Sequence, residues 1–292
     1  MKKYFTLILF NCLIISAINA QNLDSLLTSE TEVEPEYATA TFKSTRIINF
    51  QSVEQLRTKH LDFRIHHRFG PVNDGAYNFY GLDNGVITMS FEYGVTDWAE
   101  VGISRGSAEK TFNAFGKFRI LRQSSGSKVM PVSVSAYAST DFYTLKRTDV
   151  VLKNIDRFSY IYQIMVARKF NESFSLQFTP TLIHQNLVKT ALNPNDTWAF
   201  GLGGRMKLTR RSSFNSEYSY AIRPNYVGAI KTANGLSLGF DIETGGHVFQ
   251  VMLTNTNGMI ERKFITESAG SWLKGNFMLG FNISRTFSFK KD

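Results

Sequence analysis

The sequence predicts an all-β protein: one closed, antiparallel, up-and-down transmembrane β-barrel of about twelve strands. Apolar and polar residues alternate with a period of two in segment after segment, which is typical of strands with one buried face. Segments 157–169 and 173–187, joined at Asn171-Glu172, show the pattern clearly. Short and long connections also alternate along the chain. The composition agrees, with 25 Phe, 12 Tyr and 21 Gly but only 6 Pro.

The N-terminus has the pattern of a signal peptide. Lys2 and Lys3 precede an apolar run from Tyr4 to Ile18, and Asn19-Ala20 offers a cleavage point. The apolar run is shorter than the ~20 residues that a spanning helix needs. We therefore expect residues 1–20 to be a cleaved signal peptide and the mature chain to be exported to the cell outer membrane.

Cysteine and charge exclude several classes of function. The one cysteine, Cys12, lies inside the expected signal peptide. The mature chain would then hold no disulfide, no thiolate metal site and no cysteine nucleophile. The 33 basic and 24 acidic residues are scattered rather than clustered, which argues against a nucleic-acid partner.

Residues 21–58 are expected to form a separate N-terminal periplasmic segment or plug. Its first part is polar and acidic and predicts a flexible lead-in. Thr41 to Phe50 predicts a short strand, and the capping-box spacing of Ser52 and Gln55 predicts a short helix over 53–57. The segment either fills the barrel mouth as a plug, where Arg46 and Glu54 would find charged partners, or serves as a handle for a periplasmic protein partner.

Residues 59–292 are expected to form the barrel. The predicted strands are 60–69, 84–95, 98–105, 110–122, 130–142, 157–169, 173–187, 197–209, 212–222, 234–243, 246–255 and 272–289.

The connections between these strands predict which rim faces the periplasm. Strands two, four, six, eight and ten are followed by short turns, whereas most odd-numbered strands are followed by longer loops; the exception lies near Gly106. Outer-membrane barrels have short periplasmic turns and long external loops. We therefore expect both ends of the barrel on the periplasmic side, and long loops such as 256–271 as an outward binding surface.

One parity of each strand is apolar and predicts a lipid-facing surface, and aromatic residues such as Trp98 and Trp198 gather near strand ends, as interface girdles do. The other parity carries charges that would line the lumen. These candidate residues are Asp62, Arg64, His66, Arg68, Glu92, Glu100, Lys117, Arg119, Arg157, Arg205, Lys207, Glu217, Asp241 and Glu243.

Neighbouring strands often carry lumen charges of opposite sign: Arg205 lies one strand from Glu217, and Arg64 one strand from Glu92. The charges could form a salt-bridge lattice that fills a narrow lumen, since confined charges need partners. They could instead form the selective constriction of a pore. Both interpretations remain open, because about twelve strands give a bore between those of filled and open barrels.

The histidines predict neither a metal site nor an active site. His66 and His67 point to opposite faces of a strand, so one ion cannot bind both. His67 could pair with Ser268 or Ser271 as in a surface lipase, but no Gly-x-Ser-x-Gly elbow is present. We expect no catalytic residue, no cofactor and no metal.

Three runs carry a resemblance to a known family: Ser44-Thr-Arg-Ile-Ile-Asn49, Ser52-Val-Glu54 and Leu61-Asp-Phe-Arg-Ile-His-His-Arg-Phe-Gly70. They resemble the opening of an outer-membrane β-barrel family of unknown function from Bacteroidetes-type Gram-negative bacteria. The resemblance runs from about Phe42 to the C-terminus and implies location rather than chemistry. The chain departs from the usual aromatic end of outer-membrane barrels, because Lys290-Lys291-Asp292 follows Phe289.

The function that these patterns favour is a narrow pore or carrier for small polar solutes. The alternative is a non-conducting scaffold or receptor barrel that acts through its loops or N-terminal segment, and a surface lipase ranks last. The expected partners are outer-membrane lipid, the barrel assembly machinery and a periplasmic protein.

Overall fold

The computed structural model describes residues 34–146, 148, 151–188, 193–223 and 232–290. The expected signal peptide and nearly all of the lead-in therefore lie outside the described residues. The chain divides into two compact units. In the described part of the smaller unit, β1 (Glu36–Tyr37) pairs antiparallel with β6 (Ser124–Ser125). The larger unit, residues 38–123 and 130–292, contains the barrel.

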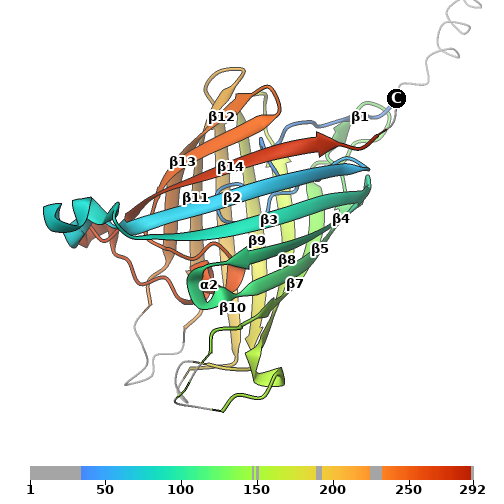
Figure 1. The fold of residues 1–292 in the computed structure, drawn as a ribbon. Helices are drawn as coiled ribbons and strands as arrows, with labels where there is room; N and C mark the ends of the chain where they lie inside the picture. The colour runs from blue at the N-terminus through green and yellow to red at the C-terminus, as the bar shows by residue number, and fades with distance from the viewer. Residues whose placement is uncertain (1–33, 147, 149–150, 189–192, 224–231, 291–292) are drawn as a thin grey trace, which may run out of the picture. The chain divides into compact units, whose positions relative to one another are not determined.

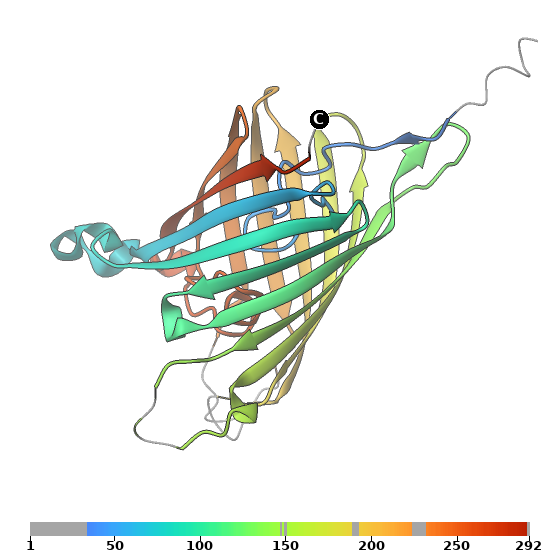
Figure 2. The same cartoon turned by 45° about the vertical axis from the view of Figure 1, so that its right-hand side comes forward.

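The described residues form a closed barrel of twelve antiparallel strands, which confirms the predicted fold class (Figures 1 and 2). Consecutive strands are neighbours, and β14 closes the ring against β2. Ser288 pairs with His60, so the first and last strands begin and end at the same rim. The strands are β2 (His60–Pro71), β3 (Gly85–Thr96), β4 (Ala99–Gly106), β5 (Phe112–Leu121), β7 (Ser133–Phe142), β8 (Phe158–Lys169), β9 (Phe174–Gln185), β10 (Asp196–Lys207), β11 (Ser212–Ala221), β12 (Gly235–Thr244), β13 (His247–Thr254) and β14 (Met278–Ser288).

Two predicted strands are too long at the rim with the longer loops. The strand expected over 272–289 begins only at Met278, because η5 (Trp272–Lys274) forms a 3-10 turn that ends at the left-handed Gly275. The strand expected over 110–122 begins at Phe112, after η3 (Ala108–Lys110). Before Met278 the apolar alternation continues through Leu273 and Phe277 into a loop that has no strand to pair with, whereas before Phe112 the positive φ of Lys110 ends the strand.

The connections differ between the two rims. At one rim, Asp97–Trp98 and Gly245–Gly246 are two-residue turns, and both glycines have the positive φ that a tight hairpin turn requires. The opposite rim carries the longer loops, with η1 (Val72–Asp74), η2 (Ala76–Gly81), η4 (Ile155–Arg157) and α2 (Glu261–Thr266). No helix in the described ranges is long and apolar enough to cross a membrane.

The outer face of the barrel is apolar along every strand, as the alternation predicts. Aromatic and aliphatic side chains alternate there with inward-facing buried residues. Trp98 and Trp198 are among the exposed aromatics near the rims. Large exposed residues of this face include Met89, Phe91, Val101, Ile103, Phe118, Tyr162, Ile164, Phe178, Leu202, Tyr218, Phe240 and Val251. An exposed apolar surface that surrounds the molecule is the surface that lipid covers.

Two parts of the chain fold into the barrel. The inner segment, residues 40–56, enters from the short-turn rim, and the inner loop, residues 255–270, enters from the other rim (Figures 1 and 2). The strand expected over 41–50 and the helix expected over 53–57 are both wrong. The inner segment has only an isolated bridge between Arg46 and Gln51. Its backbone groups bond partly to side chains of the wall, such as Glu217, and partly to groups of the segment itself, such as the Ser44 hydroxyl.

The inner loop also departs from expectation. We expected residues 256–271 to face outward, but they turn into the barrel. Phe264 and Ile265 on α2 are 2% and 0% exposed, which places them in the core rather than on a binding surface.

A charge on the outer face should destabilise the barrel. We expect Val251→Arg, in β13, to lower the free energy of unfolding by ~2–4 kcal/mol, the cost of arginine near the middle of a bilayer. Urea titration of protein refolded into lipid vesicles measures the effect. Leu273→Arg is the matched control, because Leu273 is fully exposed in η5 and should tolerate the charge. Equal costs at the two positions would show that this face does not contact lipid.

Candidate functional site: the occupied lumen

The structure brings most of the candidate lumen residues into the barrel interior. Ten of the fourteen are buried: Asp62, Arg64, His66, Arg68, Glu92, Glu100, Lys117, Arg205, Glu217 and Asp241. The other four, Arg119, Arg157, Lys207 and Glu243, are half-buried near the rims. Large apolar residues also face inward: Phe115, Tyr137, Ile161, Met165 and Ile183, on β5, β7, β8 and β9, and Met252 on β13. The lumen wall therefore combines buried polar and charged residues with apolar ones.

Glu217 on β11 holds the tip of the inner segment. Its carboxylate accepts three successive backbone N–H groups, from Ile48 at 2.7 Å, from Asn49 at 2.8 Å and from Phe50 at 2.9 Å. Successive N–H groups that converge in this way form a concave site for an anion. Here the anion is a side chain of the wall, and each such charge-assisted bond is worth ~1.5–3 kcal/mol.

Amide side chains hold the rest of the inner segment. Gln177 accepts from the N–H of Val53 at 2.9 Å and donates to the carbonyl of Gln51 at 2.7 Å. Gln250 donates to the carbonyl of Ile47 at 2.7 Å, and Asn282 donates to that of Ile48 at 3.1 Å. These three residues carry no charge, and they are therefore not among the fourteen lumen candidates that the sequence suggested.

The expected charge pairs form only in part. Lys117 pairs with Glu100 at 3.2 Å across β4 and β5, as a lattice requires. Arg205, in contrast, donates to the carbonyl of Ala40 at 2.7 Å, while Glu217 is occupied by backbone N–H groups. The inner segment has taken the place of the expected cross-strand partner.

Arg46 joins the inner segment to the inner loop. Its guanidinium lies 3.1 Å from the carboxylate of Glu261 on α2 and 3.7 Å from that of Glu92 on β3. It also donates to the carbonyl of Asn49 at 2.7 Å. Tyr137 donates to the second oxygen of Glu261 at 3.2 Å. The two inner elements, one from each rim, thus meet at a buried ion pair.

An apolar contact lies beside this ion pair. The rings of Phe50 and Phe264 meet edge to face, with centroids 4.8 Å apart. Two glycines of β10 leave room for the inner segment: a β-carbon on Gly201 would lie 2.5 Å from the ring of Phe50, and one on Gly203 would lie 2.3 Å from Cδ1 of Ile47. The wall is therefore shaped around these two side chains.

A group of charges at the long-loop rim fixes the inner loop. Arg262 of α2 lies 2.8 Å from Glu109 of η3 and also pairs with Glu267, while Lys263 lies 3.1 Å from Glu109. Burial alone would raise the pKa of Glu109, but Arg262 and Lys263 hold that pKa below its usual value. Glu109 is therefore charged at neutral pH and ties α2 to the rim.

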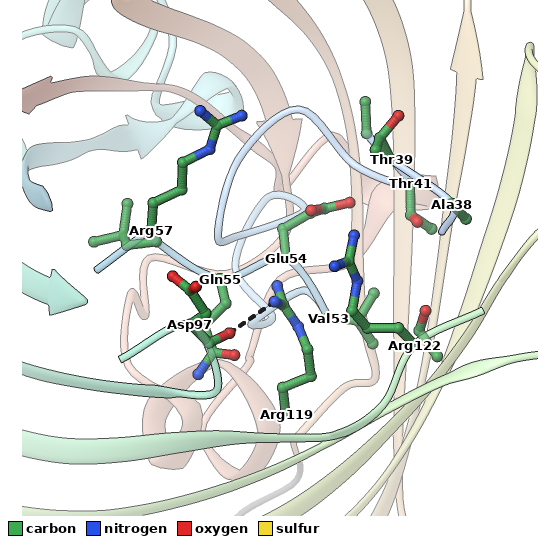
Figure 3. A pocket seen from close by; sticks show the side chains of 13 residues that line it. Ala38, Thr39, Thr41, Val53, Glu54, Gln55, Arg57, Asp97, Arg119 and Arg122 are labelled. Carbon is green, nitrogen blue, oxygen red and sulfur yellow. Dashed lines mark hydrogen bonds between the residues drawn. The ribbon is translucent and has the colours of Figure 1, made fainter. Parts of the chain in front are cut away.

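A polar pocket of about 400 Å³ lies at the short-turn rim, between the inner segment and the wall (Figure 3). Arg57, Arg119 and Arg122 line it together with Glu54 and Asp97. The Thr58 hydroxyl and backbone N–H donate to Asp97 at 2.7 and 3.2 Å and lower the pKa of that carboxyl. The inner segment thus leaves a polar space at the short-turn rim, beside the contacts described above.

The geometry offers no support for a metal site or a lipase site in the described residues. No group of three His, Asp or Glu side chains there could hold an ion. His67 stacks on Phe281 with centroids 5.0 Å apart, and Ser268 donates to the carbonyl of Phe264 at 2.7 Å inside the inner loop. The Ser268 hydroxyl is therefore hydrogen-bonded within the inner loop and is not a partner of His67.

Removal of the Glu217 carboxylate should loosen the inner segment. With Ser52→Cys as a buried thiol reporter in the mature chain, we expect Glu217→Ala to raise the rate of maleimide labelling tenfold or more, since three charge-assisted bonds are lost. Glu172→Ala is the control, because Glu172 lies exposed in a short turn. Equal labelling rates in both variants would contradict the role given to Glu217.

Acid should release the inner loop through Glu109. A carboxyl with a lowered pKa in the folded protein stabilises it above the ordinary value of ~4.3, and this contribution is lost as the pH falls through the lowered pKa. We expect Glu109→Gln to weaken hydrogen-exchange protection of residues 261–266 at pH 7. The difference from the wild type should vanish once the pH has fallen through the lowered pKa of Glu109, because its carboxyl is then protonated. A difference that is independent of pH would rule out this ion pair as its cause.

A comparison with curated proteins found no match. Similar solved structures include an outer membrane channel from Pseudomonas putida F1 (TM-score 0.49, 12% identity, covering 80% of this chain and 97% of that one) and the NanC porin (0.47, 9%, 79% and 100%). The KdgM porin is a third, with TM-score 0.46 and 6% identity over 79% of this chain and 99% of that one.

The family description "Membrane bound beta barrel domain (DUF5777)" matches residues 42–287. This match confirms the resemblance to a β-barrel family of unknown function, while the Bacteroidetes-type origin stays a prediction. The chain belongs to this family of membrane-bound β-barrel domains.

Proposed function

We propose that the protein is a gated outer-membrane passage for small polar solutes and that the structure is its closed state. In this proposal the inner segment is a plug, and residues 1–20 are a signal peptide that directs the chain to export. The assembly machinery then inserts the barrel. The role is non-enzymatic.

The observation that carries the proposal is the chemistry of the surface under the inner segment. Glu217, Gln177, Gln250 and Asn282 hold the segment through hydrogen bonds that water can replace. A permanently filled barrel gains more from apolar packing, because burying charges is costly even when they are paired. The polar part of this wall would be solvated once the segment leaves, which is what a passage for polar solutes needs.

A non-conducting receptor barrel is the second candidate. The ion pair between Arg46 and Glu261 favours it, because this contact connects an element from one rim with an element from the other. A ligand that binds at the long-loop rim and moves the inner loop would then change the position of the inner segment, and no solute would have to cross the barrel.

A reversible disulfide lock, which ties the inner segment to the wall, tests whether the segment closes a passage. A β-carbon added at Gly203 would lie 3.6 Å from Cγ1 of Ile47, close to the position that a cysteine sulfur would take. The pair Ile47→Cys and Gly203→Cys should therefore form a disulfide. In planar bilayers we expect the oxidised chain to be silent and the reduced chain to give conductance steps. The single variants, which form no lock, should not respond to reductant.

A second variant keeps the test decisive where the reduced chain opens too rarely. Ile47→Ala with Phe50→Ala removes both apolar side chains that fill the space beside Gly203 and Gly201, and this chain should conduct. Silence from this folded variant would reject the passage and leave the receptor. Equal currents from the oxidised and reduced lock would show that ions do not follow the path of the inner segment.

A further inference from the structure

The wall binds the main chain of the inner segment. Six buried or half-buried side chains hydrogen-bond to backbone groups between Ala40 and Leu56, and they come from six different strands. They are Glu100, Gln177, Arg205, Glu217, Gln250 and Asn282. Backbone groups are common to all peptides, so these contacts do not depend on which side chains the bound chain carries.

Two of these residues have a geometry suited to peptide groups. Gln177 bonds the carbonyl of Gln51 and the N–H of Val53, two residues apart, which is how a residue of a neighbouring strand pairs with an extended chain. Glu217 accepts three successive N–H groups from Ile48, Asn49 and Phe50. A solute without amide N–H groups would not satisfy this carboxylate in the same way.

The wall also provides recesses for side chains. Gly201 lies against Phe50 and Gly203 against Ile47, and a β-carbon at either glycine would clash. Both apolar side chains join the buried cluster that includes Ile161 and Met165. The recesses therefore accept two apolar side chains three positions apart, while the main chain between them turns around a carboxylate.

We propose that the lumen is a binding site for short peptides that carry two apolar side chains three positions apart, and that the inner segment occupies this site as an intramolecular ligand. This inference rests on the proposed function in one respect, since the segment must leave before a peptide enters. It goes beyond the proposed function, because a peptide with two apolar side chains is a different ligand from the small polar solutes named there.

The probe is a peptide with the sequence of residues 44–53, acetylated, amidated and labelled with a fluorophore. The host is the full chain with Ile47→Ala and Phe50→Ala in lipid nanodiscs, so that its own segment lacks the two apolar contacts that the peptide keeps. We expect saturable binding by fluorescence anisotropy. The matched control peptide carries N-methyl groups at the three amides that correspond to residues 48–50, and it should bind at least tenfold more weakly.

A second control tests whether Glu217 is responsible. In a host that also carries Glu217→Ala, the unmodified peptide should lose at least tenfold in affinity, and N-methylation should then change little. A peptide with alanine in place of both apolar residues should also bind tenfold more weakly to the first host. The N-methylated peptide and the Glu217→Ala host together form a double-mutant cycle, which measures the interaction between the peptide's amides and the Glu217 carboxylate.

The outcomes separate the inference from the proposed function. Conductance of the host with no peptide binding would overturn the inference and leave the passage intact. Equal binding of the N-methylated peptide, or equal competition by a neutral oligosaccharide of similar mass, would also overturn it. Binding of the peptide to a silent host would support the inference and reject the passage.

Discussion

The structure depends on one constraint: the buried backbone groups of the inner segment belong to no helix or sheet, and they still need hydrogen-bond partners. Residues 47–53 lie inside a barrel whose strands already pair with one another, so no ladder is available to them. An unpaired buried amide costs ~1–3 kcal/mol, and several in a row would expel the segment. The side chains of Glu217, Gln177, Gln250 and Asn282 supply the missing partners.

This constraint explains why the lumen charges do not form a simple lattice. Strand neighbours place Arg205 near Glu217, and the alternation places both residues inside. In the structure both residues hydrogen-bond to backbone groups of the inner segment instead. Lys117 and Glu100 keep each other as partners, but Glu100 also accepts the N–H of Leu56 at 2.8 Å. The wall and the segment are thus one polar network, in which partial loss is more costly than the separate bonds suggest.

The sequence predicted the barrel well, because a period of two over strands as long as β8 and β9 leaves few other solutions. Of the fourteen charged residues expected to face inward, ten are buried, but Asp141 on β7, which is also buried, was not among them. The sequence did not predict the conformation of the two inner elements, although one of its alternatives gave Arg46 charged partners inside the barrel, and the structure pairs it with Glu261 and Glu92. Thr41–Phe50 has the alternation of a strand and 53–57 has a helix cap, but the contacts that decide their conformation come from β9, β11, β13 and β14, which are distant in sequence. The local sequence of residues 255–270 offers only the apolar pair Phe264-Ile265 as a sign of a core face, and the structure buries both.

The central claim is that the inner segment is held by the wall yet opens without unfolding the barrel. Residue-resolved hydrogen exchange of the wild-type chain in lipid tests it most directly, at the amides of Ile48, Asn49, Phe50 and Val53. The account predicts protection at these four amides, with exchange faster than that of the strand amides of β8 and β9. If these amides exchange at the same rate as the strand amides, the segment is a permanent part of the core. If they show no protection, the wall does not hold the segment.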